Sequence, residues 1–234
     1  MDGEPQSSMY SAVLWDNDGV LVDTEKYYFL ATRMILSEVQ VELTEALFCE
    51  LFLVQSKGAW HLAAEKGVSQ EGLELLRSRR NELYLRMLCG EEIAVAGVED
   101  TLQRLAGKFR MAIVTSSHRD HFDAIHRRTG FLKYFDLVLT REDYRHSKPD
   151  PEPYLRATEL LKVDPQFALA IEDSKRGLTA AKRAGLACWA IPNRLSSIGD
   201  FAEADRVLTD VREVAALLLP GSHPPMRHEA LAKE

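Results

Sequence analysis

Three short apolar runs of the chain, at 12–15, 111–114 and 168–171, each end in two carboxylate or hydroxyl side chains: Asp16 and Asp18, Thr115 and Ser116, and Glu172 and Asp173. In a parallel sheet, ligands bind beyond the carboxyl ends of the strands. We therefore expect these side chains to lie close together if the three strands are neighbours. So many carboxylates in one place require a cation, because each would otherwise raise the pKa of its neighbours. Oxygen ligands with open coordination positions favour Mg²⁺ over Ca²⁺.

This set of side chains is suited to phosphoryl transfer. A carboxylate that approaches a phosphate dianion at ~4 Å meets roughly 8 kcal/mol of repulsion at an effective dielectric of ~20. A dication and a lysine turn this repulsion into a net attraction. Lys148 is the candidate lysine, because it lies in the loop beyond the expected strand at 136–139. Asp16, directly at a strand end, is the expected nucleophile, and Asp18 is the expected acid and base. Lys148, Thr115 and Ser116 are expected to bind phosphate oxygens.

The acidic pair Glu172 and Asp173 has two interpretations. Two acids at the start of a helix would interact favourably with its dipole and need no catalytic role. Together with the other polar strand ends, they favour a metal site, which Asp173 would complete and Glu172 would join or support. A calcium loop is disfavoured, because it requires glycine at its sixth position, whereas Gly19 is fourth in the segment that starts at Asp16.

An α/β core has to position these residues. After residue 90, short apolar runs alternate with amphipathic segments, which predicts a Rossmann-like parallel sheet with helices on both faces. Strands are expected at 12–15, 111–114, 136–139, 168–171, 187–191 and 206–208, and helices at 99–106, 119–128, 153–161 and 175–184.

The segment 25–90 has a different character. It contains no convincing strand, and its apolar residues recur at three- and four-residue steps, with Gly58, Gly67 and Gly72 as expected breaks. It predicts an inserted all-helical cap domain. The expected domain boundaries are then a discontinuous core of 9–24 and 91–219, a cap of 25–90, and flexible ends of 1–8 and 220–234.

Composition limits the partners. The chain has 234 residues, with 29 Lys and Arg against 36 Asp and Glu and a net charge of −7. This balance disfavours a general nucleic-acid or anionic-membrane surface. No apolar run approaches the ~20 residues of a membrane span, and the start of the chain lacks a signal-peptide pattern. Three widely spaced cysteines predict reduced, buried thiols. We expect a cytoplasmic monomer that acts on a small phosphorylated metabolite.

The motifs together resemble the haloacid dehalogenase-like superfamily of phosphohydrolases, in its β-phosphoglucomutase-related group with a helical cap. The resemblance spans about residues 10–219 and implies Mg²⁺, an aspartyl-phosphate intermediate and a cap that closes over the substrate. It also implies that the side chains of Asp16 and Asp173 and the backbone carbonyl of Asp18 bind the metal. The matching segments are 16–25 for the first motif, Thr115 for the second, Lys148-Pro149 for the third and Glu172-Asp173-Ser174 for the fourth.

Departures from the family pattern bear on the activity. Asp18 argues against dehalogenases and phosphonoacetaldehyde-cleaving members, which lack or replace the second aspartate, although Lys57 lies in the cap. Tyr28 and Thr32 stand where the mutases carry histidine and tryptophan, which favours a phosphatase. A sugar-phosphate mutase is the alternative enzyme. A regulatory module without catalysis is disfavoured, because the catalytic set is intact.

The cap loop and two histidines complete the candidate site. The segment 53–57 lacks the glycine that many relatives carry there, and we expect Gln55 and Lys57 to contact the substrate. His118 and His121 lack metal-ligand spacing, so exposed histidines are expected, with His118 at the mouth of the site as the alternative. The sequence thus predicts a Mg²⁺-dependent phosphatase of a small phosphomonoester, such as a sugar phosphate.

Overall fold

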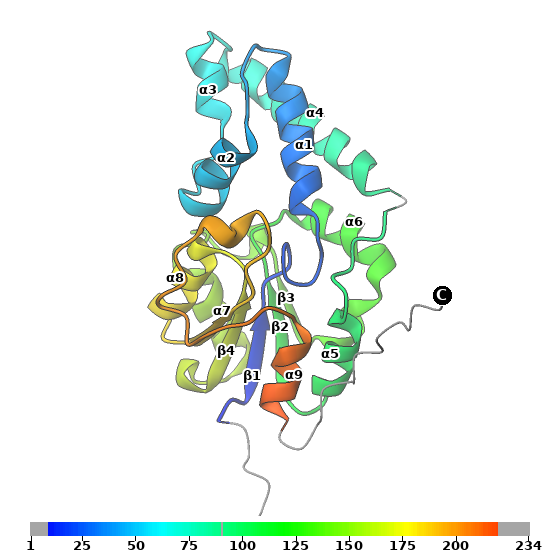
Figure 1. The fold of residues 1–234 in the computed structure, drawn as a ribbon, viewed down its shortest axis with the longest axis vertical. Helices are drawn as coiled ribbons and strands as arrows, with labels where there is room; N and C mark the ends of the chain where they lie inside the picture. The colour runs from blue at the N-terminus through cyan, green and yellow to red at the C-terminus, as the bar shows by residue number, and fades with distance from the viewer. Residues whose placement is uncertain (1–8, 90, 220–234) are drawn as a thin grey trace, which may run out of the picture.

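A computed structural model describes residues 9–89 and 91–219 and has a six-stranded parallel sheet at its centre (Figure 1). The order across the sheet is β3-β2-β1-β4-β5-β6. Every expected strand is present, with each end within one residue of its predicted position. The strands are β1 (Ala12–Trp15), β2 (Arg110–Val114), β3 (Leu137–Leu139), β4 (Ala168–Glu172), β5 (Ala187–Ala190) and β6 (Arg206–Val207).

The two faces of the sheet bury alternate strand residues under different helices. Val13 and Trp15 of β1 belong to one apolar cluster, which includes α5 (Val98–Leu105), α6 (Arg119–Thr129) and α9 (Arg212–Leu218). Ala12 and Leu14 belong to a second cluster, which includes α7 (Glu152–Leu161) and α8 (Lys175–Arg183). Because strand side chains alternate between faces, a sheet covered on both sides needs continuously apolar strands, as found here. The predicted α/β fold with helices on both faces is confirmed.

A group of helices lies beyond the carboxyl edge of the sheet (Figure 1). It consists of α1 (Glu25–Ser37), α2 (Glu45–Phe48), the π-helix η1 (Cys49–Val54), α3 (Trp60–Glu65) and α4 (Gln70–Leu88). These helices share an apolar cluster of their own, with buried residues such as Phe29, Leu36, Phe48 and Leu73. This group is the inserted helical cap.

One expected break in the cap is wrong. Gly58 and Gly67 lie between helices, whereas Gly72 lies in the first turn of α4. The helix begins there because the Ser69 side chain accepts a hydrogen bond from the Gly72 amide at 3.2 Å. Glycine at this point is therefore part of the N-terminal turn of α4.

Two segments join the cap to the sheet, and they hydrogen bond to each other. The Asp23 amide donates to the Ile93 carbonyl at 2.8 Å, and the Val95 amide donates to the Leu21 carbonyl at 3.0 Å. Between these bonds, Val22 pairs with Ala94 in an antiparallel bridge. The chain therefore enters and leaves the cap along two adjacent paths.

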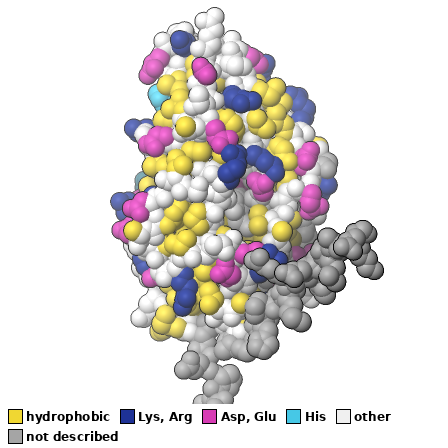
Figure 2. All heavy atoms as spheres, viewed as in Figure 1, with side chains coloured by type: hydrophobic (Ala, Val, Ile, Leu, Met, Phe, Trp, Pro, Cys, Tyr) yellow, Lys and Arg dark blue, Asp and Glu magenta, His cyan; other side chains and the backbone are white. Residues whose placement is uncertain are grey.

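The predictions for the chain ends, 1–8 and 220–234, lie outside the described residues. Of the helices in the described part, none is long and apolar enough to cross a membrane. Cys49 and Cys188 are buried free thiols, but Cys89 is exposed, because it follows the last turn of α4 where the chain leaves the cap. On the face shown in Figure 2, acidic and basic side chains are interspersed over the described surface.

Candidate active site

The order of the strands brings three polar segments to one edge of the sheet. β1 lies between β2 and β4, so the residues that follow these strands are neighbours. The Asp16 amide continues the strand pairing and donates to the Ile171 carbonyl at 2.9 Å. The Thr115 amide donates to the Leu139 carbonyl at 3.0 Å. Asp173 follows directly on β4, so the parallel sheet itself places these groups together.

Lys148 is a buried cation that joins two carboxylates at this edge. Its Nζ donates to Asp16 Oδ1, to Glu172 Oε1 and to the Val114 carbonyl, each at 2.7 Å. Burial lowers the pKa of Lys148, but Asp16 and Glu172 outweigh that effect and hold the pKa above its ordinary value. The lysine is therefore charged, and protein acceptors occupy its three donor directions. These contacts make it a group that orients Asp16.

Glu172 holds Lys148 in place and is itself fixed by further hydrogen bonds. Besides Lys148, its carboxylate accepts from the Tyr154 hydroxyl at 2.5 Å and from Ser174 Oγ at 3.3 Å. The start of α8 packs so closely on it that a Cβ built on Gly177 would lie 1.9 Å from Oε2. Of the two roles that the sequence left open for Glu172, these contacts favour support over direct metal ligation.

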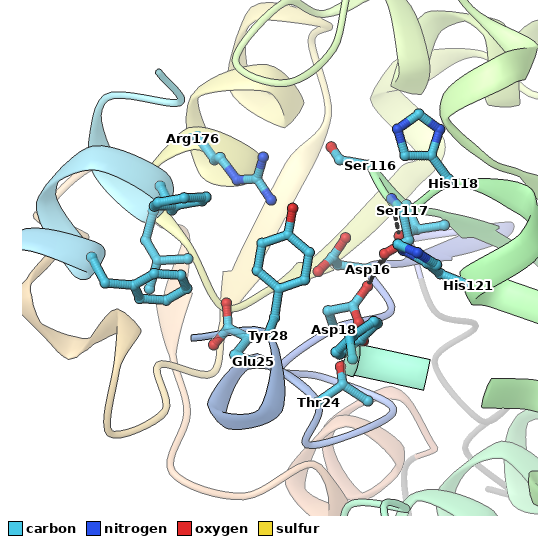
Figure 3. A pocket seen from close by; sticks show the side chains of 15 residues that line it. Asp16, Asp18, Thr24, Glu25, Tyr28, Ser116, Ser117, His118, His121 and Arg176 are labelled. Carbon is cyan, nitrogen blue, oxygen red and sulfur yellow. Dashed lines mark hydrogen bonds between the residues drawn. The ribbon is translucent and has the colours of Figure 1, made fainter. Parts of the chain in front are cut away.

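Hydroxyl groups fix the orientation of Asp18. Thr24 donates to its Oδ1, and Ser117 Oγ donates to its Oδ2 at 2.7 Å (Figure 3). Thr115 Oγ1 makes a longer contact of 3.4 Å with the same carboxylate. Asp18 is thus held between the loop after β2 and the start of α1, with its side chain at the cavity.

The side-chain amide of Asn193 links Asp173, an expected metal ligand, to a further acid, Glu25. Asn193 Nδ2 donates to Asp173 Oδ2 at 2.8 Å and to Glu25 Oε2 at 2.9 Å. The turn after Asp18 passes close by, and a Cβ on Gly19 would lie 2.3 Å from Asp173 Oδ2. Gly19 also has a φ of +90°, a conformation that other residues adopt only with strain. The Asp-x-Asp-Gly segment therefore needs its glycine for both space and backbone conformation.

The donor set fits a hard divalent cation. Carboxylate oxygens of Asp16, Glu172 and Asp173 lie within 4.8 Å of one another. Burial raises the pKa of Asp16 to about 7, although Lys148 opposes the shift. Burial also raises the pKa of Asp173 well above its usual range, and the charges of Glu25 and Asp16 add to the effect. A cation bound by the carboxylate oxygens of Asp16 and Asp173 would remove this excess of negative charge, and oxygen donors of this kind suit Mg²⁺.

The site opens into a cavity of about 160 Å³ between the core and the cap (Figure 3). This volume is below the roughly 300–1,000 Å³ of sites for drug-sized ligands, which indicates a small substrate. The lining residues of the core are polar, whereas α2 and η1 of the cap contribute an apolar wall. From the core come Asp16, Asp18, Thr115, Ser116, Ser117, His118, His121 and Arg176; from the cap and its connection come Thr24, Glu25, Tyr28, Phe48, Phe52, Leu53 and Tyr84.

The structure does not bring Gln55 and Lys57 to this cavity. At the end of the π-helix, the Gln55 amide donates to the Glu50 carbonyl at 2.9 Å, and its side chain donates to Glu50 Oε1 at 2.6 Å. The wider turn of this helix presents Phe52 and Leu53 to the cavity in their place. A π-helix has no simple sequence signature, so the spacing of apolar residues in this segment did not predict it.

The two histidines differ. His118 is exposed at the cavity mouth, with its Nδ1 2.7 Å from Glu142 Oε1. His121 is buried, and its ring packs edge-on against Tyr84 with centroids 5.2 Å apart. The expectation of an exposed side chain is therefore wrong for His121, because the α4 helix of the cap covers it.

Five residues at the site were not identified as site residues from the sequence. Thr24 and Glu25 lie within the segment 16–25 that resembles the first family motif, and Ser117 lies two residues after Thr115. Their nearness in sequence to expected site residues could have identified them. Arg176 and Asn193 had no such signal, because only tertiary packing brings them to the cavity or its acids.

Comparison with known proteins agrees with this geometry. A family model described as haloacid dehalogenase-like hydrolase matches residues 13–191. The chain belongs to this family. It is 33% identical to the phosphorylated carbohydrates phosphatase of Thermotoga maritima over 177 residues, which are 75% of the chain and 82% of that protein. It is 32% identical to the phosphoglycolate phosphatase of Nitrosospira multiformis over 207 residues, 83% of the chain and 88% of that protein.

Solved structures of the family share the fold. CbbY from Rhodobacter sphaeroides, solved in complex with phosphate, superposes with a TM-score of 0.75 at 25% identity, over 88% of this chain and 96% of that chain. β-Phosphoglucomutase from Clostridium difficile also reaches a TM-score of 0.75, at 20% identity, over 88% and 93%. The resemblance to haloacid dehalogenase-like hydrolases is thereby confirmed, and the chain is a hydrolase of this family.

Proposed function

We propose that this hydrolase is a Mg²⁺-dependent phosphatase of small phosphomonoesters, such as sugar phosphates. The observation that carries the proposal is the Asp16 carboxylate at the floor of a small capped cavity, held by buried Lys148, with the second carboxylate of Asp18 beside it. Two similar proteins, named phosphorylated carbohydrates phosphatase and phosphoglycolate phosphatase, support this substrate class.

In the first step, hydroxyl groups of Thr115 and Ser116 donate to oxygens of the bound phosphate. The Asp16 carboxylate attacks phosphorus, and a new P–O bond forms while the ester P–O bond breaks. Asp18 donates a proton to the departing alkoxide. Mg²⁺, held by the side chains of Asp16 and Asp173 and the carbonyl of Asp18, would neutralise charge on the phosphate. Lys148 adds its positive charge beside Asp16.

In the second step, a water molecule attacks the aspartyl-phosphate at phosphorus. Asp18, which lost its proton in the first step, accepts one from this water. The bond between phosphorus and Asp16 breaks, which releases inorganic phosphate and restores the carboxylate. Thr24 and Ser117 keep Asp18 in place through both steps, because their hydroxyls bind its two oxygens.

Replacement of the nucleophile tests this assignment. Asp16→Asn should lower Mg²⁺-dependent phosphate release from a panel of metabolite phosphates by at least about 10³-fold, as loss of a nucleophile does in other enzymes. Circular dichroism should show that the variant stays folded. The matched control is Asp100→Asn, at an exposed aspartate on α5, which should keep wild-type activity. Substantial residual hydrolysis by Asp16→Asn would refute the nucleophile.

The same panel separates a phosphatase from a mutase. Tyr28 replaces the histidine of the mutases and lies in the cavity wall, with its ring edge-on to Tyr84 and Phe52 at 5.4 and 6.0 Å. We expect phosphate release from β-glucose 1-phosphate to be faster than any conversion to glucose 6-phosphate. Faster isomerisation than release would make the protein a mutase.

A further inference from the structure

Arg176 is a charged residue of the cavity wall that the proposed reaction does not use. It lies in the first turn of α8, and Figure 3 shows its guanidinium pointing into the cavity from the side opposite His121. Its Nε is buried and has no hydrogen-bond partner among the described residues. The buried ion pairs of the site are made by Lys148 with Asp16 and Glu172.

A buried donor without an acceptor is unfavourable. The guanidinium also presents donors in a planar fork that matches carboxylate and phosphate oxygens. Burial lowers the pKa of Arg176, but the charges of Asp16, Glu172, Asp173 and Glu25 outweigh it and keep the residue cationic. The cavity therefore contains a permanent positive charge with free hydrogen-bonding capacity.

Arg176 comes from a different part of the fold than the hydroxyl groups that would bind the reacting phosphate. Thr115 and Ser116 follow β2, whereas Arg176 follows β4 at the start of α8. The wall beside it comes from Phe48, Phe52 and Leu53, whose side chains cannot bind the hydroxyls of a neutral substrate. The Tyr28 hydroxyl points toward the same part of the cavity as the guanidinium (Figure 3).

We propose that Arg176 binds a second anionic group of the substrate, so that the enzyme prefers phosphomonoesters that carry another phosphate or a carboxylate. This inference rests on the proposed phosphatase function and adds its substrate class. The shared chemistry is an oxyanion that accepts two hydrogen bonds from the guanidinium. The small volume of the cavity, about 160 Å³, restricts such a substrate to a short carbon chain between the two anions.

A purely structural role for Arg176 makes a different prediction. If its charge only balances Asp16, Asp173 and Glu25, its removal would strengthen Mg²⁺ binding and leave substrate preference unchanged. If it binds a second anion, its removal changes preference between substrates that differ only in that anion. Substrate preference and Mg²⁺ affinity therefore separate the two roles.

The test compares matched substrates. Ribulose 1,5-bisphosphate is paired with ribulose 5-phosphate, and 2-phosphoglycolate with 2-hydroxyethyl phosphate, to examine a second phosphate and a second carboxylate separately. Arg176→Met should lower the preference for the doubly anionic member of at least one pair by about 10- to 100-fold, chiefly through KM. Arg176→Lys, which keeps the charge but loses the fork, should give an intermediate value. The matched control is Arg156→Met, at an exposed arginine of α7.

An equal loss with both members of each pair would overturn the inference, as would tighter Mg²⁺ binding with unchanged preference. A direct binding measurement distinguishes failure of this inference from failure of the proposed phosphatase function. The same four compounds are titrated by calorimetry into Asp16→Asn, with and without Arg176→Met. A 10- to 100-fold weaker affinity for a doubly anionic compound alone supports the inference even if the wild type hydrolyses none of them, and equal affinities reject it.

Discussion

At the scale of single residues, the site depends on buried charges that are fixed by specific partners. Lys148 contacts Asp16 and Glu172; the side chains of Lys148 and Glu172 are almost fully buried, and that of Asp16 is 12% exposed, at the cavity. Breaking such a group by removing one member typically costs about 3–5 kcal/mol, because a charge is left buried and uncompensated. The arrangement therefore fixes the position of the Asp16 carboxylate.

His126 is another buried titratable residue, and it anchors the turn that carries the aspartates. Its Nε2 lies 2.8 Å from Asn17 Oδ1, and its Nδ1 lies 2.8 Å from Thr129 Oγ1. Because an amide oxygen only accepts, Nε2 carries the proton, and Nδ1 accepts from the Thr129 hydroxyl. The backbone carbonyl of Asn17 accepts a hydrogen bond from the Leu21 amide at 2.8 Å, so α6 is linked to the turn after β1.

This histidine gives a pH-dependent contribution to stability. Burial lowers the pKa of His126 from 6.5 to about 4. Between these values the unfolded chain binds the proton and the folded protein does not, so the stabilisation is present above pH 6.5 and is lost as the pH falls toward 4. The loss should amount to about 3 kcal/mol in the free energy of unfolding. Denaturant unfolding at a series of pH values measures it.

The control for this prediction is His126→Gln, which keeps a donor for Asn17 and does not titrate. Asp16 and Glu25, whose pKa values burial raises to about 7, change stability in the opposite direction over a similar range. The difference between wild type and variant removes these shared titrations. A difference that stays constant from pH 7 to 4 would show that His126 is not the buried neutral group described here.

At the scale of secondary-structure elements, the start of α8 fits against the end of β4 with no room for a methyl group. Gly177→Ala would place a Cβ about 2 Å from the Glu172 carboxylate, which Lys148 and Tyr154 hold in place. Alanine normally favours a helix over glycine by about 1 kcal/mol. Here we expect a loss of about 1–3 kcal/mol in the free energy of unfolding, together with lower kcat/KM.

Gly72→Ala is the matched control, because it is also a glycine in the first turn of a helix. Its Cβ would lie 2.8 Å from Cγ1 of Val68, the end of a partly exposed side chain that has room to move. This variant should be as stable as wild type or up to about 1 kcal/mol more stable. If Gly177→Ala proved as stable and active as Gly72→Ala, the tight support of Lys148 by Glu172 would be disproved.

The elements also show which parts of the site the sequence could predict. Strand ends are predictable, because apolar runs mark the strands and parallel pairing carries the following residues, such as Asp16 and Thr115, to one edge. The cap was predictable as a set of helices but not in its local shape. The π-helix changes which side chains face the cavity, so Phe52 replaces the expected Gln55 and Lys57. Such a shift depends on tertiary packing that no periodicity encodes.

At the scale of the whole molecule, the proposed Mg²⁺ site should link metal binding to folding, because its ligands come from segments that only the folded sheet brings together. At a concentration a hundredfold above its Kd, Mg²⁺ should stabilise the protein by about 2.7 kcal/mol. For a chain of this size, that corresponds to a rise of about 5–10 °C in Tm. EDTA should remove the rise and abolish phosphate release.

The control variant for the metal is Asp173→Asn, which keeps the shape of the side chain and removes a charged ligand. Thermal unfolding with and without Mg²⁺ should show little or no rise in Tm for this variant. An undiminished rise would mean that the ion binds elsewhere on the protein. The partly exposed group formed by His146, Asp150 and Glu152 is the other described cluster whose donor atoms lie close enough to share a cation, so it is the first place to examine in that case.

The paired connections between sheet and cap have a consequence for the connectivity of the chain. Since Asp23 bonds to Ile93 and Leu21 to Val95, the two cut points of the insert are adjacent in space. A tight loop across that junction would close the polypeptide without disturbing any strand. The helical module is thus inserted at a single place in the core, and Thr24, which follows that place directly, links the module to Asp18.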